Sequence, residues 1–300
     1  MSNENPLRNE IVTEEKKTKK KKDSASTLGK SKTLLATPYG LWMAAFIIIP
    51  LILVLYYGLT DGNGNFTLDN LSLIANPINR KALWLSLKLS LISTAICLLL
   101  AYPLALVLKS MKLKDNSFIV MVVILPMWMN FLLRTIAWQN ILEKNGVINT
   151  ILEALHLPAL NIINTPTAIV LGMVYNFLPF MILPIYNTLA KIDDNVINAA
   201  RDLGANGWVT FKRVIFPLSM PGVISGITMV FVPSLTTFAI STILGGSKIV
   251  LIGNIIEQQF QKLGNWNTGS GLSIVLMIFI LVSMTLVAKY DKDSEGTNAW

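Results

Sequence analysis

Residues 168–189 read AIVLGMVYNFLPFMILPIYNTL, a run of 22 residues without a charged side chain. No Asp, Glu, Lys or Arg occurs anywhere between Ala154 and Ala190. A helix of about 20 mostly apolar residues crosses the hydrocarbon core of a bilayer, and such a helix satisfies its own backbone hydrogen bonds there. This stretch therefore predicts a transmembrane helix.

The composition of the whole chain favours the same class of protein. Of its 300 residues, 53% are hydrophobic and only 14% are charged, whereas soluble domains carry about 25% charged residues. The mean hydropathy is +0.56. A soluble protein of this composition would expose apolar patches far larger than those usually tolerated. The sequence thus predicts an all-α, polytopic membrane protein with six transmembrane helices, at about 39–59, 83–108, 117–138, 168–189, 219–244 and 272–288.

Basic residues indicate how these spans are oriented. Eighteen Lys and Arg fall in the segments that are cytoplasmic if the N-terminus is inside, namely 1–38, 109–116, 190–218 and 289–300. Only five fall in the outer loops, and short loops rich in Lys and Arg stay in the cytoplasm. We expect both termini inside and three regions: a lysine-rich disordered tail (1–38), a membrane domain (39–289) and a short cytoplasmic tail (290–300).

The net charge of +8 does not point to nucleic acid, because about half of the excess lies in the N-terminal tail. A dense lysine run such as residues 16–22 repels itself and stays solvated. Prolines also lie within five of the six expected spans, and proline removes a backbone donor and tends to kink a helix. These prolines are explained either by a moving bundle or by ordinary packing irregularity. They are Pro50, Pro103, Pro126, Pro179, Pro184, Pro221 and Pro233.

The loop over residues 190–218 is unusual for a connection between spans. Asp193 or Asp194 can cap a short helix over the following residues, and Gly204 can end it in a left-handed conformation. Val196, Ala199, Ala200 and Leu203 share one face of that helix. Asn206-Gly207 marks a second turn or cap, after which Trp208, Phe211 and Ile215 form another apolar stripe and Pro217 breaks the chain at the membrane. Such a loop is either an interfacial elbow or a docking surface for a cytoplasmic protein.

The spacing of these residues resembles the EAA motif of ABC importer permeases. Asn198-Ala199-Ala200, three residues, Gly204, nine residues and then Val214-x-Phe216-Pro217 follow that pattern. Asn198 stands where the family commonly has Glu, and Val214 and Phe216 replace Ile and Leu. The resemblance implies a type I ABC importer permease fold whose coupling helix docks on an ATP-binding subunit. The docking residues would be Asn198, Ala199, Ala200, Asp202, Leu203, Gly204, Trp208, Phe211 and Pro217.

Longer stretches resemble the spermidine/putrescine permeases of that class, most closely their first permease subunit. The similarity covers about residues 39–290, and its clearest segments are 126–128, 133–134, 178–186, 199–205, 218–222, 245–248 and 251–254. It implies an ATP-driven polyamine importer in a prokaryotic plasma membrane. The implied partners are two copies of an ATP-binding subunit, a second permease, an extracellular polyamine-binding protein and membrane lipid.

The chain itself carries no signature of ATP binding or metal binding. No Gly-x4-Gly-Lys-Ser/Thr loop occurs, so we expect no cofactor in this chain and ATP bound by the partner. The only histidine, His156, lies in an expected outer loop, and no cluster with metal-ligand spacing surrounds it. We find no nucleophile and base in a catalytic pattern, and we therefore expect a non-enzyme.

A path for a polycation has to be built without carboxylates, because none of the 17 Asp and Glu lies within an expected span. Aromatic faces, amides and carbonyls freed at proline breaks can hold ammonium groups instead. The candidates are Trp128, Asn130, Tyr175, Asn176, Phe180 and Tyr186, each of which serves equally well as packing or as an interface anchor. Asp61 and Glu257 are candidates for the outer mouth. Lys88 and Arg134 lie toward the outer ends of their spans, and we expect both to snorkel to the headgroups.

Two other functions remain alternatives on sequence grounds. An ABC importer permease for another small solute, such as an amino acid, a sugar, an anion or iron, would share the same loop. A secondary transporter working without ATP would normally place carboxylates inside the membrane. Because the expected spans contain none, this second alternative is the less favoured of the two.

Overall fold

The computed structural model of the chain describes residues 38–111, 121, 123, 125–246 and 248–297, with side chains described as far as residue 287. The lysine-rich tail over residues 1–37, the loop over 112–120 and the beginning of the expected third span lie outside the described residues.

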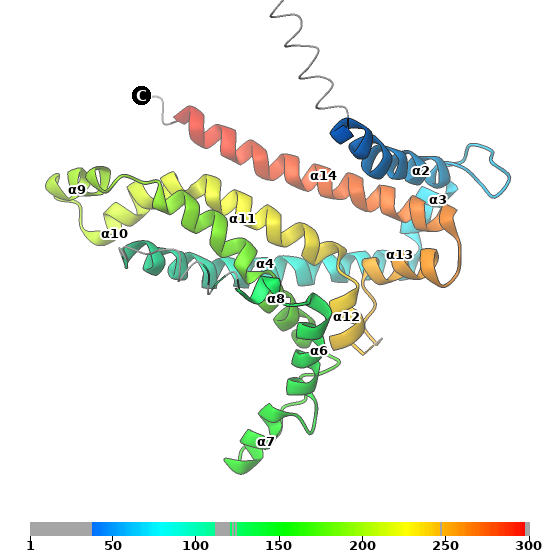
Figure 1. Cartoon of the computed structure of the whole chain (residues 1–300), viewed down its shortest axis with the longest axis horizontal. Coiled ribbons are helices and arrows are strands. Elements are labelled where there is room, and N and C mark those ends of the chain that lie inside the picture. Colours follow the sequence, from blue (N-terminus) through cyan, green and yellow to red (C-terminus); the bar gives the residue numbers. More distant parts are fainter. Residues whose placement is uncertain (1–37, 112–120, 122, 124, 247, 298–300) are drawn as a thin grey trace, which may run out of the picture. The chain divides into compact units, whose positions relative to one another are not determined.

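The described part of the chain is helical and contains no strand beyond one isolated bridge between Thr60 and Phe66 (Figure 1). The π-helical turns are η1 (Ala44–Ile48) and η3 (Phe211–Ile215), and η2 (Leu73–Ala75) is a 3₁₀ turn. The α-helices are α2 (Ile49–Gly58), α3 (Asp69–Ser72), α4 (Pro77–Ser110), α6 (Phe131–Leu142), α7 (Val147–Ala154), α8 (Pro166–Ala190), α9 (Asp194–Asp202), α10 (Gly207–Thr210), α11 (Phe216–Thr236), α12 (Ala239–Leu244), α13 (Ile252–Gln261) and α14 (Trp266–Thr297).

Among the described residues, five helices are long and apolar enough to cross a membrane: Pro38–Gly58, Pro77–Ser110, Pro166–Ala190, Gly207–Thr236 and Trp266–Val287. Expected spans at 39–59, 83–108, 168–189 and 272–288 coincide with four of them to within a few residues. The all-helical membrane fold is therefore confirmed, whereas the two remaining spans differ from expectation.

The expected fifth span, 219–244, is not one helix. It begins earlier, as a continuous helix from Gly207, and it ends at Thr236. The π-turn η3 leads directly into α11, so the expected break at Pro217 is wrong: Pro217 is the second residue of α11, and the helix runs on through it because its fixed φ is a helical one. The chain instead breaks at Thr237, whose backbone is extended (φ −62°, ψ 138°), and α12 follows as a separate short helix.

The expected third span, 117–138, is also interrupted. Its described residues are helical up to Trp128, leave the helix at Met129 and Asn130, and resume in α6. The Asn130 side chain accepts hydrogen bonds from the N–H groups of Leu132 and Leu133, at 2.9 and 3.2 Å. An asparagine cap of this kind starts a new helix, which explains why α6 is a separate element.

The chain divides into two compact units between Tyr56 and Tyr57. The described residues of the first unit form a single apolar helix that contains the turn η1. Along this helix the rings of Tyr39 and Trp42 stack with centroids 6.5 Å apart, and Trp42 and Phe46 lie 5.6 Å apart.

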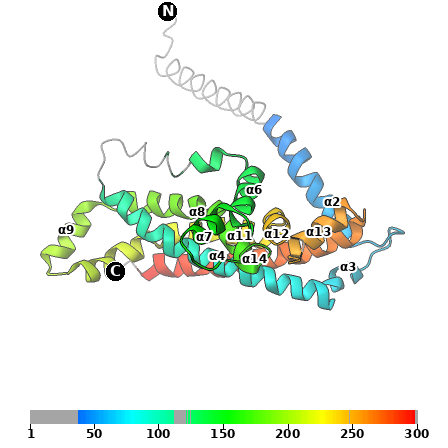
Figure 2. The ribbon, with the colours of Figure 1, turned by 90° about the horizontal axis from the view of Figure 1, so that it is seen from below.

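The centre of the second unit is formed by α4, α8 and α11, which pack against one another in all three pairings (Figures 1 and 2). Small residues make the close approach possible, as is usual between membrane helices. Gly222 and Gly226 of α11 lie one turn apart and face α8. A Cβ atom on Gly222 would lie 2.7 Å from the carbonyl oxygen of Pro184, and one on Gly226 would lie 2.7 Å from the sulfur of Met181.

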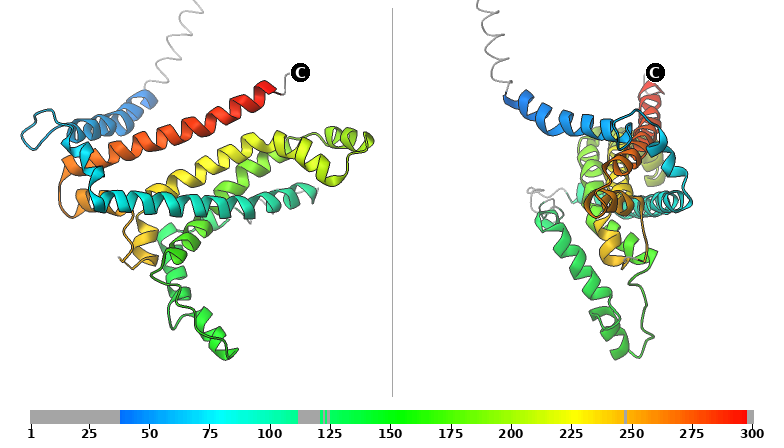
Figure 3. Two further views of the ribbon diagram at one scale, coloured as in Figure 1. Left: turned by 180° about the vertical axis from the view of Figure 1, so that it is seen from behind. Right: turned by 90° about the vertical axis from the view of Figure 1, so that its right-hand side faces the viewer.

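The two ends of this three-helix core carry different structures. Helices α8 and α11 run antiparallel. At one end α9 and α10 connect them, and at the opposite end α12 follows α11 (Figure 3). Near α12, helix α13 packs on α14, and α14 also packs on α3. The Asn267 and Asn70 amides both donate to the Thr60 carbonyl, at 2.7 and 2.8 Å, which fixes the chain that enters α3.

Candidate functional site

The short helix α9 begins as its sequence predicts. Asp193 is the N-cap, and its carboxylate accepts the N–H of Asn195 at 2.9 Å. The helix ends before Gly204, whose φ of +83° is the left-handed conformation that the sequence predicts for this glycine. Asp194 in the first turn and Arg201 in the last turn match the helix dipole. Local rules therefore account for both ends of this helix.

One face of α9 is apolar and uncovered. Leu203 is 90% exposed and Val196 is 46% exposed, whereas Ile197 on the inner side is 8% exposed. Ala199, Asn198 and Asp202 are exposed as well, and Ala200 is half-buried. An interfacial elbow packed beneath the bundle would bury Val196 and Leu203 instead. The described residues thus present an apolar surface, which we call the α9 face and define as Val196, Ala199, Ala200 and Leu203.

The second half of the loop joins this surface to the helix core. Asn206 caps α10 by accepting the N–H of Val209 at 2.9 Å, as its sequence predicts. Trp208 is 70% exposed and stacks on Phe211, with ring centroids 5.7 Å apart. Phe211 in turn meets the buried ring of Tyr102 on α4 edge-on, at 5.8 Å. A line of aromatic rings therefore leads from the surface of the loop to the interior of the bundle.

The six candidate path residues do not form one cluster. Trp128 is 76% exposed, and the Asn130 side chain is engaged as the cap of α6. Tyr186 is buried (7% exposed), whereas Phe180 is 37% exposed. These four side chains therefore range from buried to largely exposed.

Tyr175 and Asn176 are brought together with α6. The Tyr175 ring meets Trp138 edge-on, with centroids 5.1 Å apart. Asn176 is 1% exposed and donates to the Gly172 carbonyl at 2.9 Å and to the Thr135 hydroxyl at 3.4 Å. Its amide oxygen is buried and has no hydrogen-bond partner among the described residues.

Arg134 was expected to snorkel to the headgroups, and this expectation is wrong. The side chain is 6% exposed, and its Nη1 donates to the carbonyl of Pro126. Its Cζ lies 5.9 Å from the centroid of the Tyr175 ring, a cation–π distance. Pro126 stands just before the break in the third span, so the guanidinium binds the carbonyl end of one helical piece from the next. Lys88, in contrast, is exposed as expected.

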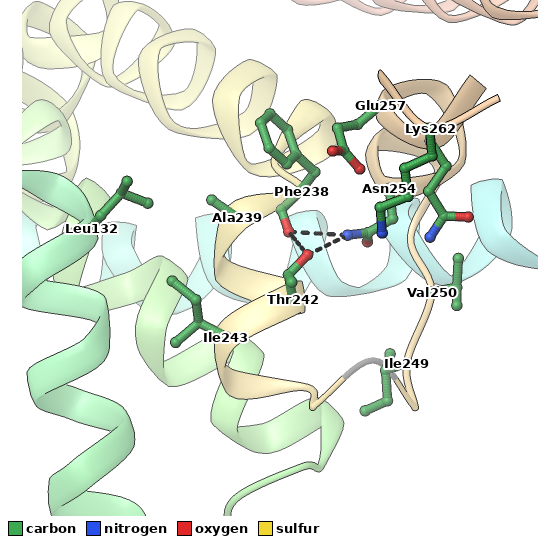
Figure 4. A pocket seen from close by; sticks show the side chains of 11 residues that line it. Leu132, Phe238, Ala239, Thr242, Ile243, Ile249, Val250, Asn254, Glu257 and Lys262 are labelled. Carbon is green, nitrogen blue, oxygen red and sulfur yellow. Dashed lines mark hydrogen bonds between the residues drawn. The ribbon is translucent and has the colours of Figure 1, made fainter. Parts of the chain in front are cut away.

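Beside the break at Thr237 lies a cavity of mixed apolar and polar lining that the sequence did not reveal (Figure 4). Asn254 holds the break in place: its amide donates to the Phe238 carbonyl at 3.0 Å and to the Thr242 hydroxyl at 2.8 Å, and its oxygen accepts the Ser241 hydroxyl at 2.6 Å. Gly253 leaves room for the Thr236 and Thr237 carbonyls, which a Cβ atom would meet at 2.5 and 2.8 Å. The only sequence signal was the 251–254 segment, noted as part of a resemblance.

Glu257 lines this cavity, which has a volume of about 260 Å³, and it also lines a neighbouring apolar cavity of about 510 Å³. In Figure 4 the side chains of Phe238, Asn254, Glu257 and Lys262 gather on one side, and Leu132 of α6 lies across from them. The site combines one carboxylate, one aromatic ring and the hydrogen-bonding groups around the helix break. A carboxylate beside an aromatic ring is suited to an ammonium group. Lys262, which lines the same cavity, carries the charge opposite to that of Glu257.

The other outer-mouth candidate, Asp61, is occupied by its own loop. Its carboxylate accepts the N–H groups of Asn63 and Asn65, both at 2.8 Å. The hydrogen bond from Asn65, followed by that from Asn63, lowers the pKa of Asp61 below its ordinary value of 3.8. Asp61 is therefore ionised at neutral pH and shapes the turn that follows the first span. Within the described residues, no group of three or more His, Cys, Asp and Glu side chains is placed to hold a metal ion.

Comparison with known proteins identifies the family. Residues 31–292 match the model of the "Binding-protein-dependent transport system inner membrane component" family. The chain belongs to this family. Among its relatives, the spermidine/putrescine transport system permease protein PotB of Haemophilus influenzae is 38% identical over 259 residues, covering 84% of this chain and 91% of the relative. The PotB protein of Escherichia coli K12 is 36% identical, covering 79% and 89%.

Two further matches are more distant in sequence. The inner membrane ABC transporter permease protein YdcU of Escherichia coli is 30% identical over 74% of this chain and 75% of its own length. A crystal structure of a bacterial alginate ABC transporter, in complex with an alginate-bound periplasmic protein, aligns with a TM-score of 0.72 over 87% of this chain and 94% of that one. The sequence identity is 15%, so this likeness shows the fold alone. The inner-membrane permease fold expected from the sequence is thereby confirmed.

Proposed function

We propose that this chain is a transmembrane permease subunit of an ATP-driven importer of polyamines such as spermidine and putrescine. The support for the cargo is the identity of 36–38% to PotB proteins over most of both chains. The support for ATP drive is the α9 face, an apolar surface on a loop where Leu203 is 90% exposed. That single observation carries the mechanism, because an uncovered apolar helix face needs a partner to bury it.

The α9 face is the docking surface for an ATP-binding subunit. Ala199 and Ala200 allow close approach of the partner, and Gly204 turns the chain sharply beyond the contact. Asn198, Asp202, Trp208 and Phe211 complete the surface or connect it to the bundle, and Pro217 begins the helix that receives the movement. ATP is bound by the partner, present in two copies, and this chain carries no cofactor and catalyses no reaction.

The orientation follows from the charge distribution, with both termini in the cytoplasm. A second permease subunit completes the path through the prokaryotic plasma membrane, and an extracellular binding protein delivers the polyamine at the end of the bundle opposite α9. Glu257 and Phe238 line a cavity at that end. We assign the entry of the cationic cargo to this cavity, with Tyr175, Asn176, Phe180 and Tyr186 of α8 farther along the path.

Uptake of radiolabelled spermidine tests the cargo and the energy source together. The chain is expressed with its partner subunits, and uptake is measured with an excess of unlabelled amines, amino acids, sugars or anions. We expect only polyamines to compete and uptake to stop when ATP is depleted. Competition by amino acids, sugars or anions instead of polyamines would change the cargo. Full activity of this chain reconstituted alone would contradict the ATP-driven mechanism.

A further inference from the structure

Helix α4 is not adjacent in the sequence to the loop that carries α9. It nevertheless contacts both arms of that loop: the incoming arm, between α8 and α9, and the outgoing arm, between α10 and α11. Among the described residues of α4, Lys109 hydrogen-bonds to the loop at Ile192, and Tyr102 packs its ring against Phe211 and Phe216 of the loop. Tyr102 and Lys109 lie seven residues apart, which places them two turns apart on the same face of the helix. One face of α4 therefore meets the loop twice.

Lys109 holds the incoming arm. Its ammonium donates to the carbonyl of Ile192 at 3.2 Å. Ile192 lies between the end of α8 and the cap of α9, so this contact fixes the point where α9 begins. The Asp194 carboxylate, in the first turn of α9, attracts the same ammonium electrostatically.

A cavity lies between α9 and α4, and Lys109 is one of the residues that line it. The cavity has a volume of about 320 Å³ and is lined by the last turn of α4, by the inner side of α9 and by Ile215. Helix α9 packs mainly against α10 and η3, which belong to its own loop, and Ile197 is its one buried residue. The hydrogen bond from Lys109 to the residue before the cap of α9 therefore helps to set where α9 lies.

Tyr102 holds the outgoing arm. Its ring is 8% exposed and packs against Phe211 and Phe216, with centroids 5.8 and 6.0 Å away. Its hydroxyl is hydrogen-bonded to that of Ser219 at 2.7 Å. The chain that leaves α10 is thus bound to α4 just where it enters the three-helix core.

We propose that Lys109 and Tyr102 are positioning residues that hold both arms of the coupling loop against one face of α4. Movement of α9 then shifts α4 together with α8 and α11. Helix α4 is 34 residues long, and Ser86, near its other end, accepts the N–H of Ile252 at 2.9 Å. This contact places α4 beside the start of α13, the helix that carries Glu257. The inference rests on the proposed function, because it assigns these residues a part in transmitting the movement that ATP hydrolysis drives.

The test is the number of cargo molecules imported per ATP hydrolysed by the assembled importer in proteoliposomes. Lys109→Met removes the donor and the charge at similar side-chain length. We expect it to lower this ratio by about two- to thirtyfold, the range observed for side chains that modulate coupling between sites. Lys109→Arg keeps the donor and the charge and should retain most of the ratio. Tyr102→Phe removes only the hydroxyl contact and should give a smaller loss than Lys109→Met.

Lys81→Met is the matched control, because Lys81 is an exposed lysine at the opposite end of α4. It should leave the ratio unchanged. A wild-type ratio in Lys109→Met would overturn the inference while leaving the proposed function intact. Failure of Lys109→Met and Lys109→Gln to assemble would also overturn it, since the lysine would then serve the fold alone. Absence of ATP-driven import by the unaltered chain would overturn the proposed function and this role with it.

Discussion

The guanidinium of Arg134 on α6 lies 5.9 Å from the ring centroid of Tyr175 on α8, and the arginine is 6% exposed. Its Nη1 also donates to the carbonyl of Pro126, at the end of the preceding helical piece. A buried charge costs several kcal/mol unless it is held by such groups. Arg134 therefore joins the two pieces of the broken third span to the three-helix core.

We expect Arg134→Leu to destabilise the protein by about 2 kcal/mol, because hydrogen bonds to charged groups contribute about 1.5–3 kcal/mol. The measurement is the midpoint of denaturant unfolding in detergent. Lys88→Leu is the control, since Lys88 is an exposed cation within α4 and its loss should change the midpoint little. Equal shifts for the two variants would contradict the role of Arg134.

Glu257 provides a test of cargo entry. Its carboxylate lines the cavity beside Phe238, so Glu257→Gln keeps the size of the side chain and removes the charge that attracts an ammonium group. We expect the apparent KM for spermidine uptake to rise about tenfold, the effect of losing one charge-assisted contact. Glu153→Gln, at an exposed position of α7, should leave the KM unchanged. An unaltered KM in Glu257→Gln would remove this residue from the path.

Docking on the α9 face is tested by adding a charge within that face, at Ala200, or directly beside it, at Gly204. Ala200→Glu and Gly204→Asp should abolish ATP-driven uptake while leaving membrane insertion intact, because a buried carboxylate without a partner disrupts docking. Gly264→Asp is the matched control: Gly264 also has a positive φ (+60°), and a Cβ atom there would meet nothing within 4 Å, as at Gly204. If Gly264→Asp abolished uptake too, backbone strain rather than docking would explain the result.

The packing of α8 on α11 is tested at Gly222. An added Cβ atom would lie 2.5 Å from the Thr188 hydroxyl and 2.7 Å from the Pro184 carbonyl, so one of the helices has to move. We expect Gly222→Ala to lower the free energy of unfolding by about 1–3 kcal/mol, the usual cost of overpacking. Gly40→Ala adds a methyl group in open space on another helix, and its unfolding free energy should stay equal or rise.

Asp61 gives a pH-dependent prediction. Since the pKa of Asp61 is lowered in the folded chain, its stabilising effect is complete above the ordinary value of 3.8 and is lost as the pH falls through the lower, folded value. Asp61→Asn should therefore speed hydrogen exchange of the Asn63 and Asn65 amides at neutral pH, where the wild-type carboxylate accepts both. Exchange rates equal to those of the wild type would show that the turn forms without this carboxylate.

What the sequence predicted well was local. The ends of α9 follow from Asp193 as a cap and Gly204 as a left-handed stop, and both depend on residues within the helix and next to it. The apolar spans at 168–189 and 83–108 were recognised because hydrophobicity over about 20 residues is itself the physical requirement for crossing a bilayer. These features need no knowledge of which helices become neighbours.

What the sequence missed depended on distant partners. The break at Thr237 is held by Asn254, which donates to the Phe238 carbonyl from 16 residues later in the chain. Hydropathy does not show where such an amide will lie. Arg134 was placed at the surface because its position along the span is compatible with snorkelling, whereas Tyr175 and Pro126 receive it in the interior. The candidate path residues were chosen by type; Tyr175 and Asn176 contact side chains of α6, whereas the Asn130 side chain caps that helix.

The π-turn at Phe211–Ile215 constrains how this region can change in evolution. A π-turn holds one residue more than an α-turn would at the same place. Deleting a single residue there would convert the turn to ordinary α-helix, while the helix on either side would keep nearly the same orientation about its axis. Trp208 would leave the line of rings that ends at Tyr102 only if the deleted residue were Phe211, which stands between them. The length of this turn can therefore change by one residue, whereas the aromatic ring at position 211 has to be kept.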